Sequence, residues 1–100
     1  MTEDEINKSL SSDNALFGLY AIRSPNASSA NIDKALNNPD SFIRFHAIRN
    51  SNASEENINK ALDDSCIDVK LAAMNHPNAT KANKEKAAND PVLIAYLLKR

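Results

Sequence analysis

The sequence predicts an all-α protein, an α-solenoid (superhelix) of about four stacked two-helix repeats. Three observations indicate this fold. Similar residues recur every 26 positions, glycine occurs only once in 100 residues, and a hydroxyl residue stands where each repeat can begin a helix. The scarcity of glycine also argues against β-hairpins and glycine-rich phosphate loops. We expect one domain, residues 1–100, with repeats at about 2–27, 28–53, 54–79 and 80–100.

The 26-residue spacing joins both turn residues and apolar residues. An asparagine followed by alanine and by serine or threonine begins at Asn26, Asn52 and Asn78. The same spacing joins three apolar sets: Ile6, Ile32 and Ile58; Leu10, Leu36 and Leu62; Ala21, Ala47 and Ala73. One such repeat is too small to bury its own apolar surface, so we expect neighbouring repeats to cover one another.

The first helix of each repeat is expected to begin at a hydroxyl residue that accepts a hydrogen bond from the first turn. These residues are Thr2, Ser28, Ser54 and Thr80. Thr2 with Glu5, three residues later, matches a capping box, in which the two residues bond each other's backbone amides. The other three repeats carry asparagine in place of the glutamate, which predicts a weaker form of the same cap.

The second helix of each repeat is expected to begin at a short polar residue. These residues are Ser12, Asn38, Asp64 and Asp90, with Pro39 and Pro91 following at the first helical position, where a missing N–H costs nothing. Ile43, Ala47 and Ile48 in the second repeat occupy more than one face. That distribution suits a helix packed between two neighbouring repeats.

The pattern resembles the leucine-rich repeat variant family, within the HEAT-like α-solenoid group. The matching residues are Asn38-Pro39-Asp40, Ile43-Arg44, Ala47 and 50–54, with parts repeated at Asp90-Pro91 and 76–80. The resemblance covers nearly the whole chain and implies a scaffold whose second helices line a concave binding face. The repeat is two residues longer than is usual in that family. The single cysteine, Cys66, cannot supply the ligands of the iron–sulfur centre that some members hold, so no cofactor is implied.

Composition and motifs favour a binding protein over an enzyme. The two histidines, His46 and His76, have no acidic or cysteine neighbour at zinc-ligand spacing, and no carboxylate pair stands out as an acid–base couple. We therefore expect no catalytic residue and no metal site. The longest apolar stretch, 92–98, is shorter than the roughly 20 residues of a membrane span. A single cysteine and the lack of a secretory signal fit the cytoplasm.

The leading candidate for partner binding is the concave row of the second helices. It contains Gly18, which leaves a gap, followed by Arg44, Lys70 and Tyr96. Arg23 and Arg49 form a second short row near the helix ends, where they also complement the helix dipole. Arginine and tyrosine are frequent at interface hot spots. The expected function is therefore protein–protein interaction, as an adaptor or inhibitor, with a partner that the sequence does not identify.

Two alternatives use other surfaces. The lysines Lys8, Lys34, Lys60 and Lys86 would form a stripe that could follow a nucleic-acid backbone, although the net charge of −1 makes this partner less favoured. The last second helix is apolar almost throughout. Its residues Leu93, Leu97 and Leu98 are the candidate patch for a homodimer or another structural homo-oligomer.

Overall fold

The structure, a computed structural model, describes all 100 residues of the chain. It contains eight α-helices and no β-strand, which confirms the predicted all-α class. The helices are α1 (Glu3–Leu10), α2 (Ala15–Ile22), α3 (Ser29–Ala35), α4 (Ser41–Arg49), α5 (Glu55–Ala61), α6 (Ile67–Met74), α7 (Lys81–Ala88) and α8 (Pro91–Leu98).

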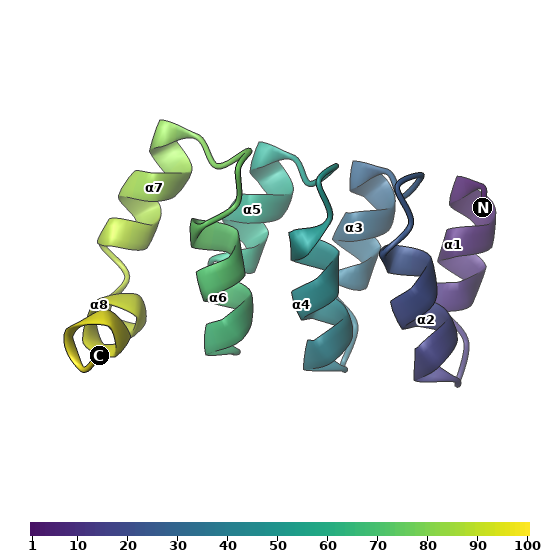
Figure 1. Cartoon of the computed structure of the whole chain (residues 1–100), viewed down its shortest axis with the longest axis horizontal. Coiled ribbons are helices and arrows are strands. Elements are labelled where there is room, and N and C mark those ends of the chain that lie inside the picture. The colour runs from purple at the N-terminus through teal and green to yellow at the C-terminus, as the bar shows by residue number, and fades with distance from the viewer.

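The helices lie in two rows along the long axis of the molecule (Figure 1). Helices α1, α3, α5 and α7 form one row, and α2, α4 and α6 form a second row in front of it. The molecule measures 40 × 24 × 17 Å, and the first and last helices lie at opposite ends of it. Helix α8 is turned out of the second row and is seen nearly end-on. No helix combines the length and the apolar character that crossing a bilayer requires.

The first-row helices begin where the sequence predicts. Thr2, Ser28, Ser54 and Thr80 are the N-caps of α1, α3, α5 and α7. In α3 the amide of Asn31 donates to Ser28 Oγ at 3.1 Å, and the amide of Ser28 donates to Asn31 Oδ1 at 3.0 Å. All four caps are complete capping boxes. The asparagine therefore closes the box as fully as Glu5 does, although we expected a weaker cap.

The second-row helices begin two residues later than predicted in the first three pairs. Their N-caps are Asn14, Asp40 and Cys66, and only α8 begins at its predicted cap, Asp90. Ser12, Asn38 and Asp64 instead accept the amide N–H two residues ahead. They shape the turn before the helix, as short polar side chains commonly do. Pro91 is the first residue of α8, as predicted, whereas Pro39 precedes α4.

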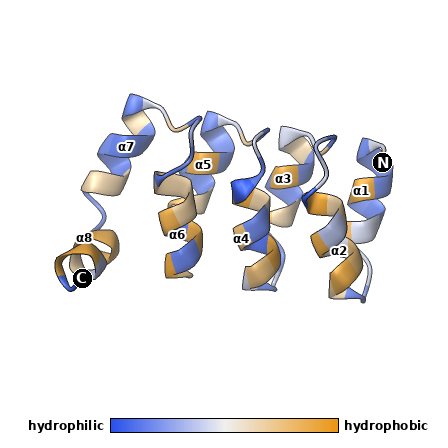
Figure 2. Ribbon diagram, in the orientation of Figure 1, coloured by the Kyte–Doolittle hydropathy of each residue, from blue (hydrophilic) through white to orange (hydrophobic).

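The core is one continuous cluster of 19 buried apolar residues from both rows. Ile6, Ile32 and Ile58 come from first-row helices, and Ile22 and Ile48 come from second-row helices; all five are fully buried. Each such side chain stabilises the fold by about 1.5–3 kcal/mol relative to exposure to water. The colouring in Figure 2 shows that α2 and α8 are mostly apolar, whereas α7 is mostly polar.

Hydrogen bonds of asparagine side chains also join neighbouring helix pairs. Asn31 Nδ2 donates to the carbonyl of Glu3 at 3.1 Å and to Asn7 Oδ1 at 2.7 Å. The corresponding amides of Asn57 and Asn83 donate to first-row carbonyls 28 residues earlier. Asn31 is fully buried, so its satisfied amide avoids the penalty for an unpaired polar group.

A second set of asparagine bonds lies in the loops that join one pair to the next. Asn52 Nδ2 donates to the carbonyls of Pro25 and Ala27, both at 2.8 Å. Asn78 repeats this contact with Ser51 at 2.8 Å and Ala53 at 3.0 Å. The recurrent asparagines Asn52 and Asn78 therefore join successive loops, beyond the local turn role that the sequence suggested.

Candidate protein-binding surface

Arg44 does not lie on an open surface, because the turn before the next second-row helix, α6, supplies it with an acidic partner. Its Nε donates to Asp64 Oδ2 at 2.9 Å, and Nη2 donates to Asp64 Oδ1 at 3.2 Å. Nη1 donates to the carbonyls of Asn38 at 2.8 Å and Pro39 at 3.1 Å. The two side chains are only 15% and 9% exposed. The guanidinium of Arg44, which was assigned to the concave binding row, is therefore engaged within the protein.

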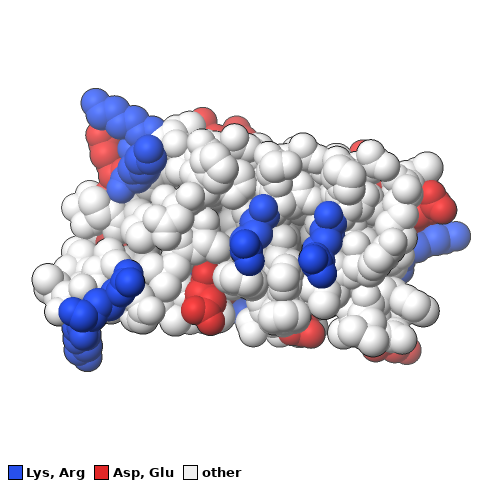
Figure 3. All heavy atoms as spheres, viewed as in Figure 1, with Lys and Arg blue, Asp and Glu red and all other residues white.

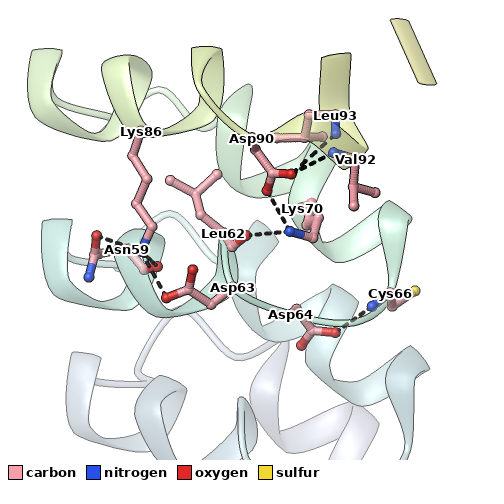
Figure 4. Close-up of polar contacts among 10 residues, drawn as sticks. All are labelled: Asn59, Leu62, Asp63, Asp64, Cys66, Lys70, Lys86, Asp90, Val92 and Leu93. Atoms are coloured by element: carbon pink, nitrogen blue, oxygen red, sulfur yellow. Dashed lines mark hydrogen bonds and ion pairs between the residues drawn. The ribbon is translucent and has the colours of Figure 1, made fainter. Parts of the chain in front are cut away.

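Lys70 is held in the same way. Its Nζ donates to the carbonyl of Leu62 at 2.9 Å and to the carboxylate of Asp90, as Figure 4 shows. This ammonium group, together with the amide N–H of Val92, lowers the pKa of Asp90 below its ordinary value of 3.8. Lys70 is buried, so the ammonium group of this second residue of the concave row is also engaged within the protein. The gap predicted at Gly18 is filled, because a Cβ there would meet Ile43 Cδ1 at 3.3 Å.

Three of the four ladder lysines also make contacts within the protein. Lys34 Nζ donates to the carbonyl of Asn7 at 3.2 Å and to Ser11 Oγ at 2.9 Å. Lys60 pairs with Asp33 at 3.0 Å, and Lys86 pairs with Asp63 at 2.8 Å. Lys86 appears with its partners in Figure 4. Each ammonium group thus lies over the preceding first-row helix, and only Lys8 makes no such contact.

The exposed apolar patch on the C-terminal helix differs in its residues from the one expected, because Val92 and Ile94 are exposed as well. Leu93 is fully buried against the core, so its assignment to an exposed patch is wrong. Leu97 is 41% exposed and Leu98 80% exposed. They line a groove of about 370 Å³ at the C-terminal end of the molecule, together with Met74, Lys84, Ala87, Ala88 and Ile94. Tyr96 is 41% exposed but lies on α8, which is turned out of the row of α4 and α6.

The largest concentration of exposed aromatic side chains lies on α2 and α4, which sequence analysis did not single out. We define the α2–α4 face by Leu16, Tyr20 and Arg23 together with Phe42, His46 and Arg49. These residues stand at sequence positions i, i+4 and i+7, which share one side of a helix, and Arg23 is the C-cap residue that follows α2. Leu16 is 70%, Tyr20 76% and Phe42 55% exposed. The signal was present in the sequence, because the 26-residue spacing places these two triplets in register.

Aromatic contacts organise the α4 part of this face. His46 packs edge-on against Phe42, with ring centroids 4.6 Å apart, and against Phe45 at 5.3 Å. The guanidinium carbon of Arg49 lies 5.4 Å from the centroid of the Phe45 ring. This distance is within the range of a cation–π interaction. The guanidinium group of Arg49 therefore lies over the Phe45 ring, and its N–H donors make no hydrogen bond within the protein.

Arg23 and Arg49 are the two basic residues of this face. Neither guanidinium forms an ion pair or a side-chain hydrogen bond, in contrast to Arg44 and Lys70. Partial burial and then the charges of Arg23 and Arg49 lower the pKa of His46 below its ordinary value of 6.5. Figure 3 shows two neighbouring basic side chains in the middle of this side of the molecule, with acidic atoms below and to the lower left of them.

A small hollow adjoins the face between α4 and α6. It measures about 130 Å³ and is lined by Ser41, Phe42, Phe45, Cys66 and Asp68. Cys66 is a half-buried free thiol at the start of α6. Two phenylalanine rings make the hollow largely apolar, with Ser41 and Asp68 as the polar residues of its lining, and its size suits one aliphatic side chain.

The remaining titratable residues form no cluster with ligand geometry. His76 is buried in a turn, where Nδ1 accepts the amide N–H of Asn78 at 3.0 Å and Nε2 lies 2.9 Å from the carbonyl of Asn50. No group of three His, Cys, Asp or Glu side chains is arranged to hold a metal ion. Comparison with protein-family models, curated proteins and solved structures finds no match to this chain.

Proposed function

We propose that this chain is an α-solenoid of four helix pairs, similar to the leucine-rich repeat variant and HEAT-like proteins, that acts as a non-enzymatic protein-interaction module. Its binding surface is the α2–α4 face. The observation that carries the proposal is the exposure of Leu16, Tyr20 and Phe42 beside two arginines that have no partner within the protein. Exposed aromatic and arginine residues that lie together are typical of interface hot spots. The single free cysteine supports a reducing compartment such as the cytoplasm.

The test compares capture by the native protein with capture by a face variant. Immobilised protein carrying Tyr20→Ser and Phe42→Ser is expected to lose specific partners that the native protein retains from a cell extract. Both side chains are exposed, so the variant should keep its fold, which circular dichroism checks. A matched control, Leu97→Ser with Leu98→Ser, removes apolar surface at the C-terminal end and should leave capture unchanged. Equal capture by native protein and face variant would contradict the proposal.

A second candidate function is self-association through the C-terminal end. It is supported by the exposed side chains of Leu97 and Leu98 and by the mainly apolar groove that they line. Association through this groove predicts a molar mass that rises with concentration in light scattering and falls to the monomer value in the Leu97→Ser/Leu98→Ser variant. A monomer at millimolar concentration would exclude it.

The lysine ladder gives less support to nucleic-acid binding. Lys34, Lys60 and Lys86 already donate to neighbouring helices, and the net charge of −1 provides no long-range attraction to a phosphate backbone.

A further inference from the structure

We propose that the α2–α4 face recognises an acidic protein segment, whose carboxylate binds between Arg23 and Arg49 while a nearby aliphatic side chain enters the hollow between α4 and α6. This inference rests on the proposed function and specifies the chemistry of the partner. It follows from three features: the unpaired charges of the face, the adjoining apolar hollow, and the short distance from Arg49 to the Phe45 ring that lines the hollow.

The first feature is a local excess of positive charge. Elsewhere on the second row, the cations Arg44 and Lys70 are neutralised by Asp64 and Asp90. Arg23 and Arg49 form no ion pair with an acid, and none of the six residues of the α2–α4 face is acidic; the nearest acid in the proposed site is Asp68, which lines the adjoining hollow. A guanidinium group presents a planar fork of donors that matches a carboxylate in two-point contact. Complementary charge therefore favours Asp or Glu in the partner over neutral or basic residues.

The second feature is the hollow beside Phe42 and Phe45. Its volume of about 130 Å³ suits one aliphatic side chain. Burial of a Leu or Ile side chain there would contribute up to about 1.5–3 kcal/mol, which is more than an exposed ion pair of about 0–1 kcal/mol supplies. The apolar contact in the hollow thus provides most of the affinity, and the arginines favour partner segments that have an acidic residue near the apolar one.

The third feature fixes the spacing of the two groups in the partner. Phe45 lines the hollow, and the guanidinium carbon of Arg49 lies 5.4 Å from its ring centroid. A carboxylate bound by Arg49 and a side chain in the hollow must therefore come from neighbouring positions. Residues three or four apart in a helix, with Cβ atoms about 5–6 Å apart, or two apart in a strand meet this condition. An isolated phosphate or nucleic-acid backbone would satisfy the arginines but leave the hollow empty.

The experiment is selection from a displayed library of random 12-residue peptides on the immobilised full chain. We expect the selected peptides to be enriched in Asp or Glu within four residues of Leu, Ile or Val. Replacing the acidic residues of a selected peptide by Gln or Asn should weaken binding at least about tenfold. Binding should also weaken with added salt, because part of the interaction is between exposed charges.

Protein variants locate the binding site. Arg23→Glu/Arg49→Glu should weaken binding of the acidic peptides by more than about tenfold, and Arg23→Gln/Arg49→Gln by somewhat less. The matched control is Lys81→Glu/Arg100→Glu, which makes the same charge change at exposed cations outside the face and should leave affinity within about twofold. Thermal unfolding checks that each variant is folded.

The outcomes separate this inference from the proposed function. Selected peptides without acidic enrichment that still lose binding to the Tyr20→Ser/Phe42→Ser variant would overturn the inference and leave the function standing. Failure to select any peptide, or peptides that bind the native protein and this variant equally, would contradict the proposed function itself. Equal loss of binding in the Lys81→Glu/Arg100→Glu control would overturn the assignment of the carboxylate site to Arg23 and Arg49.

Discussion

Asp64 accepts two hydrogen bonds from Arg44, which lies twenty residues earlier and on the preceding second-row helix, at 2.9 and 3.2 Å. Lys70 and Asp90 repeat the relationship at the same sequence separation. In both cases the acid also accepts the amide N–H two residues ahead of it, which fixes the carboxylate in place. The two ion pairs therefore connect the start of one helix to the middle of its neighbour.

Removing Asp64 should destabilise the protein strongly. In Asp64→Ala the guanidinium of Arg44 stays largely buried without its acid, so we expect the free energy of unfolding to fall by about 2–4 kcal/mol. Urea denaturation followed by circular dichroism measures this change. The control is Asp33→Ala, which breaks an ion pair whose acid is 58% exposed and should cost less than about 1 kcal/mol. Equal losses in the two variants would show that the Arg44 pair contributes no more than a surface pair.

The loop asparagines offer a matched comparison of one residue type at equivalent positions. Asn52 donates to two carbonyls of the preceding loop, whereas the exposed side chain of Asn26, 26 residues earlier, makes no hydrogen bond. Asn52→Ala should lower the free energy of unfolding by about 1–3 kcal/mol, because it leaves these carbonyls without their donor. Asn26→Ala should change it by less than about 0.5 kcal/mol. A similar effect at both positions would rule out a stabilising role for the contact between loops.

Acid should weaken the fold partly through Asp90. Its pKa is lower in the folded protein than its ordinary value of 3.8, because Lys70 and the amide of Val92 donate to the carboxylate. The unfolded chain therefore takes up this proton more readily, so the stabilisation is complete above pH 3.8 and is lost as the pH falls through the lowered pKa. Between about pH 5 and pH 2 the native protein should lose stability more steeply than Asp90→Asn, which should be less stable at neutral pH. Parallel pH profiles from urea denaturation would contradict this account.

Gly18 lies within α2, where the tip of Ile43 approaches it. Alanine in its place should stabilise the helix by about 0.5–1 kcal/mol, provided that Ile43 Cδ1, 3.3 Å from the new Cβ, moves by a few tenths of an ångström. That atom is the flexible end of its side chain, so we expect a net rise of about 0.5 kcal/mol in the Gly18→Ala variant. Gly18→Val adds bulk that this movement cannot accommodate and should cost about 1–3 kcal/mol. Thermal unfolding of both variants tests the contact, and an unchanged midpoint for Gly18→Val would refute it.

The sequence predicted the class and the first-row helix starts because those features depend on local chemistry. A hydroxyl such as Ser28 caps the helix that immediately follows it, and the 26-residue spacing identifies the equivalent residues. The second-row starts were misplaced because Asn38 and Asp64 can accept an amide N–H in a turn as well as at an N-cap. The turned position of α8 depends on packing between distant residues, which the spacing alone does not encode.

The candidate site was predicted less well, because exposure depends on which helices pack together. Arg44 and Lys70 were assigned to a surface row, but each forms an ion pair with an acid twenty residues later in the sequence, Asp64 or Asp90. Arg23 and Arg49 are exposed, and their assignment to a binding row stays a prediction. The apolar residues beside them, such as Leu16 and Phe42, were overlooked because an apolar residue on a predicted core helix is ordinarily expected to be buried.

The bonds that asparagine side chains and Lys34, Lys60 and Lys86 make between helix pairs all run in one direction, with the donor in the later pair and the acceptor in the earlier one. During synthesis from the N-terminus, each new pair would therefore meet acceptors that have already been made. The two buried ion pairs run the opposite way, so Arg44 and Lys70 emerge from the ribosome twenty residues before their acids. A chain that ended at residue 53 would consequently contain Arg44 without Asp64, the acid that pairs with its guanidinium group.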